Sequence, residues 1–170
     1  MRTLNYGLGA MVIAASLLQP QARAHEEHGG RWQGLEGVWL VKLAPRDCTT
    51  GNPLPVPPIQ NLFTFNGDGT LSASMQNYAV SYTNRSLSHG LWRSKSPGRG
   101  RGEYVMRFTH LRYDFASGVY LGTQEALSQV ALARSGEQFT AVSQTRGIDA
   151  NGNQAYTGCA NLTGDRMPQP

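Results

Sequence analysis

The chain has 170 residues, 39% of them hydrophobic, so it can form one ordinary domain with a substantial core. Its formal net charge is +4, from 15 Lys and Arg against 11 Asp and Glu. Two of these arginines and no acid lie in the first 24 residues, which leaves 13 basic against 11 acidic residues in the rest of the chain. So small an excess does not favour a nucleic-acid-binding protein.

Residues 1–24 have the three parts of a secretory signal peptide. Arg2 gives a basic start, Gly7–Leu18 is an uncharged and mostly apolar run, and Ala22-Arg23-Ala24 offers a cleavage site with small residues. A helix of that run would span only about 18 Å of a hydrocarbon core roughly 30 Å thick. A retained N-terminal anchor is the alternative. We expect an exported protein, periplasmic or secreted, whose mature chain begins at His25 and has no transmembrane segment.

The rest of the chain has the pattern of an all-β protein. Residues 25–34 are polar and Gly-rich, which predicts a flexible arm. Beyond them, short β-rich runs alternate with Gly, Asn, Asp and Pro, and no sustained helical period occurs. The eight predicted strands are Gly37–Ala44, Asn61–Asn66, Thr70–Gln76, His89–Ser94, Glu103–Asp114, Val119–Ala133, Gln138–Ile148 and Gln154–Arg166. We expect a β-barrel domain over residues 35–167 and a tail at 168–170.

The connections predict an up-and-down meander. Asn66–Gly69 has residues that tolerate the positive φ angles of a tight hairpin. Three connections are longer, namely Pro45–Gln60, Ala79–Ser88 and Lys95–Gly102. The segment Gln124–Arg134 is the best candidate for a helix, but its alternation favours a long strand that bends near Gly122. A meander of eight strands protects its edges best by closing, so the sequence predicts an eight-stranded antiparallel barrel.

Cys48 and Cys159 are the two cysteines of the chain. In an exported protein an even pair is most simply a structural disulfide. Free or catalytic thiols are the alternative, but the sequence has no C-x-x-C motif to support them.

A G-x-W motif lies at the start of the first predicted strand, in Glu36-Gly37-Val38-Trp39. It resembles the signature of lipocalins and their calycin relatives. In that family the tryptophan plugs the closed end of an eight-stranded barrel, and a basic residue near the end of the last strand stacks over it. The resemblance therefore implies a lipocalin-like barrel in which Gly37, Trp39 and Arg166 are structural, with Arg166 in a cation–π contact over the indole ring.

The chain also departs from that family. The acidic and aromatic turn motif of lipocalins has no counterpart, since the nearest fragment is Tyr113-Asp114, and no helix is expected after the last strand. The resemblance is therefore to a divergent member. The sequences of avidin-like and allene-oxide-cyclase-like barrels begin in a similar way, so these families are alternatives to a lipocalin-like barrel.

One arithmetic relation supports closure of the barrel. Paired positions on two antiparallel strands have a constant sum. This sum is 205 for Trp39 and Arg166, and 207 for Cys48 and Cys159. A single register of the first strand against the last can therefore serve both contacts, apart from a bulge or a diagonal offset.

Alternation along the predicted strands indicates the interior of the barrel. The residues expected to contact a ligand are Trp39, Phe63, Phe65, Trp92, Tyr104, Met106, Phe108 and Phe139. His110 and Arg112 continue the inward parity toward one end, where they could bind a carboxylate or act as an acid/base pair. A solvated rim is the alternative for both residues. His89 is expected outside if Trp92 is inside, so it does not pair with His110.

Two charged segments are candidate binding sites. Four basic residues, Arg93, Lys95, Arg99 and Arg101, predict an exposed loop that could meet an anionic surface or an acidic partner. The arm segment His25-Glu26-Glu27-His28 has metal-like composition, but no helix fixes its geometry. No cofactor and no specific metal site are expected.

These observations leave three functions open. The first is an exported barrel that binds a small apolar or amphiphilic ligand in its interior. The second is an envelope or secreted interaction protein with a filled barrel, which acts through its basic loops. The third is a cofactor-free isomerase or cyclase that uses His110 or Arg112 in a barrel pocket. No nucleophile elbow, P-loop or paired-carboxylate motif favours a particular enzyme class.

Overall fold

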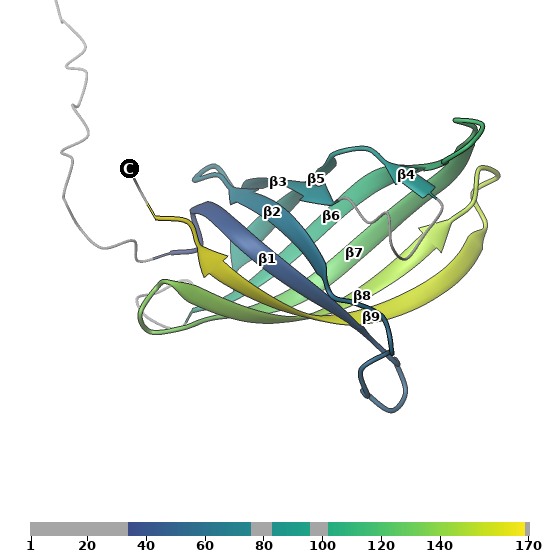
Figure 1. Ribbon diagram of the computed structural model, residues 1–170. Helices are drawn as coiled ribbons and strands as arrows, with labels where there is room; N and C mark the ends of the chain where they lie inside the picture. The colour runs from purple at the N-terminus through teal and green to yellow at the C-terminus, as the bar shows by residue number, and fades with distance from the viewer. Residues whose placement is uncertain (1–33, 76–82, 96–101, 169–170) are drawn as a thin grey trace, which may run out of the picture.

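Nine antiparallel strands are present in the computed structural model, which describes residues 34–75, 83–95 and 102–168 (Figure 1). The strands are β1 (Gly37–Arg46), β2 (Ile59–Phe65), β3 (Thr70–Met75), β4 (Thr83–Arg85), β5 (Ser88–Ser94), β6 (Glu103–Asp114), β7 (Tyr120–Leu132), β8 (Gln138–Ile148) and β9 (Gln154–Arg166). Within these ranges there is no helix, and hence none of the length and apolarity needed to span a bilayer.

The nine strands form an eight-stranded closed barrel. The short strand β4 and the strand β5 both pair with β6, and they occupy one position in the ring. Ser86 lies between them and keeps this edge attached to β6, because its backbone N–H donates to the Leu111 carbonyl and its hydroxyl accepts from the Leu111 N–H. Pairing of β6 with β7 and of β1 with β9 then closes the ring, which confirms the predicted fold.

The segment Gln124–Arg134, for which the sequence left helix and strand open, lies mostly in strand β7. This strand runs unbroken from Tyr120 to Leu132 and pairs on both sides. At the position of the predicted bend, the pairing of β7 with β6 shifts in register next to Gly122. The φ angle of Gly122 is 114°. A Cβ at this position would lie 2.0 Å from the carbonyl oxygen of Ile148, so the bend requires glycine.

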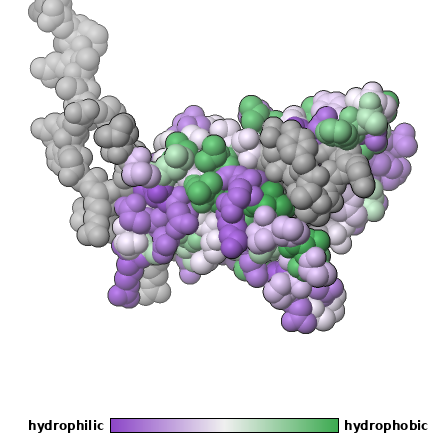
Figure 2. Space-filling model, in the orientation of Figure 1, coloured by the Kyte–Doolittle hydropathy of each residue, from purple (hydrophilic) through white to green (hydrophobic). Residues whose placement is uncertain are grey.

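Alternation along each strand decides which residues face the interior. On β2 and β6 nearly every second residue is buried, as expected for strands with one face on a core. The outer face carries scattered exposed apolar residues such as Val38, Leu40 and Leu62. Figure 2 shows that apolar areas on the face in view are interrupted by hydrophilic ones.

The ladder between β1 and β9 has the predicted register. Trp39 is paired with Arg166, and Arg46 is paired with Cys159. Cys48 lies two residues past Arg46, and it is bonded to Cys159 with a Cα–Cα distance of 5.2 Å. The disulfide therefore fastens the beginning of the 47–58 connection to the strand that closes the barrel.

Loss of this disulfide is expected to weaken the barrel substantially. It joins residues 111 positions apart, and in the chain-entropy model a loop of that length stabilises the native state by roughly 4 to 5 kcal/mol. A Cys48→Ser/Cys159→Ser variant should lose about this amount in urea unfolding, and the reduced parent chain should match it. An unchanged free energy of unfolding would contradict the role given to this bond.

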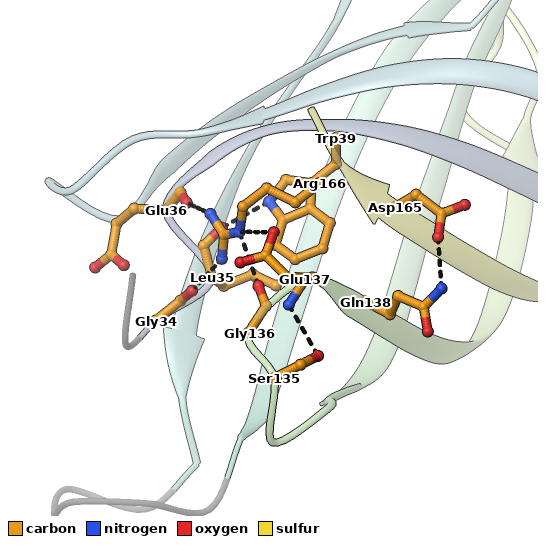
Figure 3. Close-up of polar contacts among 10 residues, drawn as sticks. All are labelled: Gly34, Leu35, Glu36, Trp39, Ser135, Gly136, Glu137, Gln138, Asp165 and Arg166. Atoms are coloured by element: carbon orange, nitrogen blue, oxygen red, sulfur yellow. Dashed lines mark hydrogen bonds and ion pairs between the residues drawn. The ribbon is translucent and has the colours of Figure 1, made fainter. Parts of the chain in front are cut away.

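The beginning of β1 and the end of β9 together close one end of the barrel. Trp39 is fully buried, and its indole N–H donates to the Leu35 carbonyl at 2.9 Å. The Arg166 guanidinium carbon lies 4.2 Å from the centre of the Trp39 ring, which confirms the predicted cation–π contact. The same guanidinium donates to the carbonyls of Gly34, Glu36 and Gly136 (Figure 3).

This arrangement explains the glycine of the G-x-W motif. Gly37 has a φ of 120°, and a Cβ there would lie 2.8 Å from Nη1 of Arg166. Any side chain at Gly37 would therefore strain the backbone and displace the guanidinium from Trp39.

Arg166→Lys should destabilise the protein although the charge is retained. A lysine ammonium lacks the planar fork that reaches three carbonyls and covers the indole, so we expect a loss of about 2 to 4 kcal/mol in chemical unfolding. Arg134→Lys, at an exposed position, is the matched control and should change little. Equal stability of Arg166→Lys and the parent chain would show that the fork is not needed.

Candidate functional site

The interior is filled at the closed end by a cluster of aromatic rings. Phe139 lies edge-on to Trp39 with ring centres 5.0 Å apart, and Phe63 contacts both Phe65 and Phe108. Trp92 extends the cluster through Phe65 and Tyr104. These contacts leave the closed end packed in the manner of an ordinary protein core.

The eight residues predicted to contact a ligand all lie on the inner side of the barrel, and most belong to this cluster. Seven are buried, and Trp92 is half-buried and packs against the core. Only Phe108 among the eight borders the large cavity described below. A role for the other seven as ligand contacts stays a prediction.

A layer of buried polar residues lies beyond the aromatic cluster. Ser128 donates its hydroxyl hydrogen to Ser143 at 2.9 Å, between β7 and β8. The Ser88 hydroxyl lies 3.4 Å from Nδ1 of His110, and Gln124 stands directly opposite His110 on β7. This layer marks the change from a packed interior to an open one.

The opposite end of the barrel holds a cavity of about 610 Å³. In Figure 1 this is the end where the β6–β7 and β8–β9 hairpins extend farthest and where the 47–58 connection leaves β1. Its apolar lining residues are Leu43, Leu54, Ile59, Phe108, Ala126 and Ala160. Its polar lining residues include Arg46, Arg85, Arg112, Gln124, Ser143, Thr145, Tyr156 and Thr157. The volume lies within the usual range for small-molecule sites.

Two arginines are neighbours in the wall of this cavity. Arg85 on β4 is the direct partner of Arg112 on β6, so the two side chains project from the same face of the sheet. The guanidinium carbon of Arg112 lies 4.9 Å from the centre of the Tyr156 ring. The Tyr156 hydroxyl donates to Oε1 of Gln124 at 2.7 Å, which fixes the ring against β7.

The arginines make this end of the interior electropositive. Burial lowers the pKa of Arg85, and the neighbouring charge of Arg112 lowers it further, while Tyr156 acts in the opposite direction. Burial and then the charge of Arg85 lower the pKa of His110 to about 4, and Gln124 opposes this shift. His110 is therefore neutral at pH 7.

His110 is not on a solvated rim. Its side chain is 1% exposed, so the rim interpretation is wrong for this residue. It lies beside the cavity rather than among the residues that line it, whereas Arg112 is half-buried and lines the cavity directly. His89 is exposed and lies on the outer face, as predicted from the inward position of Trp92.

The 47–58 connection and the disulfide form the outer edge of the cavity. Asp47, Cys48 and Cys159 border it. Oδ1 of Asp47 accepts hydrogen bonds from the backbone N–H and the hydroxyl of Thr50 and from the backbone N–H of Thr49. These bonds hold the pKa of this carboxyl below its usual value. The carboxylate of Asp47 therefore stabilises the conformation of the 47–58 connection.

The predicted basic loop is described only in part. Arg93 is exposed, and Nζ of Lys95 donates to Oε1 of Gln129 at 2.8 Å. Arg99 and Arg101 lie outside the described residues, as do the predicted signal peptide at 1–24 and the segment His25–His28. Their predicted roles stay predictions.

Comparisons with known proteins do not assign the chain to a family. No protein-family model matches the chain, and no curated protein shows significant sequence similarity to it.

The buried neutral His110 predicts a specific pH dependence of stability. Its pKa of about 4 lies below the ordinary value of 6.5, so between these values the unfolded chain binds the proton more strongly than the folded one. This contribution destabilises the protein as the pH falls, by about 2 kcal/mol between pH 7 and pH 5. His110→Leu should remove that part of the pH dependence, while the exposed control His89→Leu should keep it. Parallel pH profiles for His110→Leu and the parent chain would contradict a buried neutral imidazole.

Proposed function

We propose that this protein is an exported lipocalin-like barrel that binds one small apolar or amphiphilic ligand in the open end of its interior. The observation that carries the proposal is the cavity of about 610 Å³, which is lined by both apolar and polar side chains. A packed aromatic cluster behind it would give the ligand a rigid floor at Phe108.

Export is supported by the disulfide between Cys48 and Cys159. Such bonds persist in oxidising compartments, and the signal-like composition of residues 1–24 points the same way. The lipocalin-like character rests on the G-x-W motif, on the Arg166–Trp39 contact, and on the antiparallel ring of eight strand positions.

The two other functions drawn from the sequence have less support. A filled barrel would act through its surface alone, but here the interior is packed only toward Trp39. An isomerase would use His110 or Arg112. The His110 side chain is enclosed beside the cavity with Ser88 at Nδ1, whereas Arg112 lines the cavity. Ligand binding does not require His110 or Arg112 to take part in a reaction, so binding is the function that the geometry favours.

The proposal predicts saturable uptake of a neutral apolar fluorophore such as N-phenyl-1-naphthylamine. One molecule should bind per chain and quench tryptophan emission. Ala126→Phe should weaken binding by at least about tenfold, because the added ring occupies the cavity. Leu62→Phe, which adds the same ring at an exposed position on the outer face of β2, should leave binding unchanged.

Two outcomes would reject the interior site. One is the absence of saturable binding to the folded chain. The other is equal binding by the Ala126 and Leu62 variants, once circular dichroism has shown that both are folded.

A further inference from the structure

The direct pairing of Arg85 with Arg112 is the least expected feature of the cavity. Like charges directly opposite each other on neighbouring strands destabilise a sheet. Both side chains are half-buried, which weakens the screening by water that would otherwise make such a pair harmless. The folded chain alone gives no reason for this arrangement.

The described residues provide no acid to neutralise the pair. Their ion pairs join Arg107 and Arg146 to Glu125 on the outer face, and Arg166 to Glu137 at the closed end. Asp47, the acid bordering the cavity, is engaged by Thr49 and Thr50.

One guanidinium nitrogen of this arginine pair lacks a hydrogen-bond acceptor in the described part of the chain. Nε of Arg85 is buried and has no hydrogen-bond partner among the described residues. A buried guanidinium N–H without an acceptor is costly, and an anion in the cavity would supply the missing charge and lone pairs.

Neighbouring residues hold the Arg112 guanidinium in place. The Tyr156 ring lies against it and is itself fixed by Gln124. Gly147, the partner of Tyr156 on β8, makes room for the ring, because a Cβ there would lie 2.0 Å from the ring atom Cε1. On its other side Arg112 is paired with Gly122, which has no side chain to compete for the guanidinium.

The wall of the same cavity also offers a place for an apolar group. Leu43 and Ile59 are a buried pair on β1 and β2, and Phe108 borders the cavity from β6. A ligand with one charged and one apolar end would match both the arginines and the apolar residues that line the cavity.

We propose that the ligand is a small amphiphilic carboxylate whose carboxylate group is bound between Arg85 and Arg112. The apolar body of the ligand would lie against Leu43, Ile59 and Phe108. This inference rests on the proposed function and names the chemical class that the same cavity selects.

The test uses two fluorescent probes that share a ring system and tether. Pyrenebutyrate carries the carboxylate, and pyrenebutanol carries a neutral hydroxyl in its place. At low ionic strength the folded chain should bind pyrenebutyrate about tenfold more tightly than pyrenebutanol, as expected for one charge-assisted contact. High salt should reduce this preference.

Arg85→Gln and Arg112→Gln should each weaken pyrenebutyrate binding about tenfold and leave pyrenebutanol binding within about twofold. Arg107→Gln is the matched control, because it removes the same charge from β6 on the outer face. Arg112→Lys should retain part of the preference, since the charge stays but the planar fork is lost.

Stability without ligand gives a second readout. Because the opposed arginines repel each other, Arg85→Gln should leave the thermal midpoint of the free protein unchanged or raise it. A clear fall in this midpoint would assign Arg85 a structural role and overturn the inference.

The binding outcomes separate the two proposals. Equal affinity for both probes, or loss of both affinities in the arginine variants, would overturn the carboxylate inference and leave an interior site for apolar ligands. Failure of the folded parent chain to bind either probe would overturn the proposed function together with the inference.

Discussion

The antiparallel ladder between β1 and β9 is the constraint on which the rest of the structure depends. It turns a meander into a ring, and it carries the disulfide toward one end and the Trp39–Arg166 contact at the other. A slip of one residue in this ladder would turn Trp39 and Val41 outward and separate Arg166 from the indole. The long-range pairing therefore fixes, at the same time, which residues face the interior and which end is closed.

The two ends differ because their inner positions differ in size and polarity. Large rings from β1, β2, β5, β6 and β8, Trp39 among them, meet at the closed end and fill the barrel there. Toward the other end the inner positions hold Ala126, Ser143 and Ala160, which are too small to meet across the barrel. An eight-stranded barrel is just wide enough either to be filled by side chains or to hold one small ligand, and this chain does the first at one end and leaves space at the other.

The sequence predicted the barrel and its closing register because both leave local signals. Alternation marks the strands, Gly37 and Trp39 mark the first strand, and the cysteine positions fit the same ladder as Arg166. Of the side chains that line the open end, the sequence predicted Phe108 and Arg112 as candidate site residues. Arg85 was missed because β4 is three residues long and lies in a stretch with no clear period. Tyr156 could have been found, since it has the same parity along β9 as the buried residues Ala160 and Leu162. The burial of His110 depends on Ser88 and Gln124, which come from other strands.

The barrel interior is closed at Trp39 and open at Arg85 and Arg112. Methyl NMR of the folded protein during titration with a neutral apolar ligand can distinguish the two ends. We expect chemical-shift changes at the methyl groups of Leu43, Ile59 and Ala126. Little change is expected at Val130, which lies deeper in the core, or at the outward-facing Leu40. Shifts confined to Leu40 and other outer residues, with the cavity methyl groups unmoved, would contradict an interior that is open at that end.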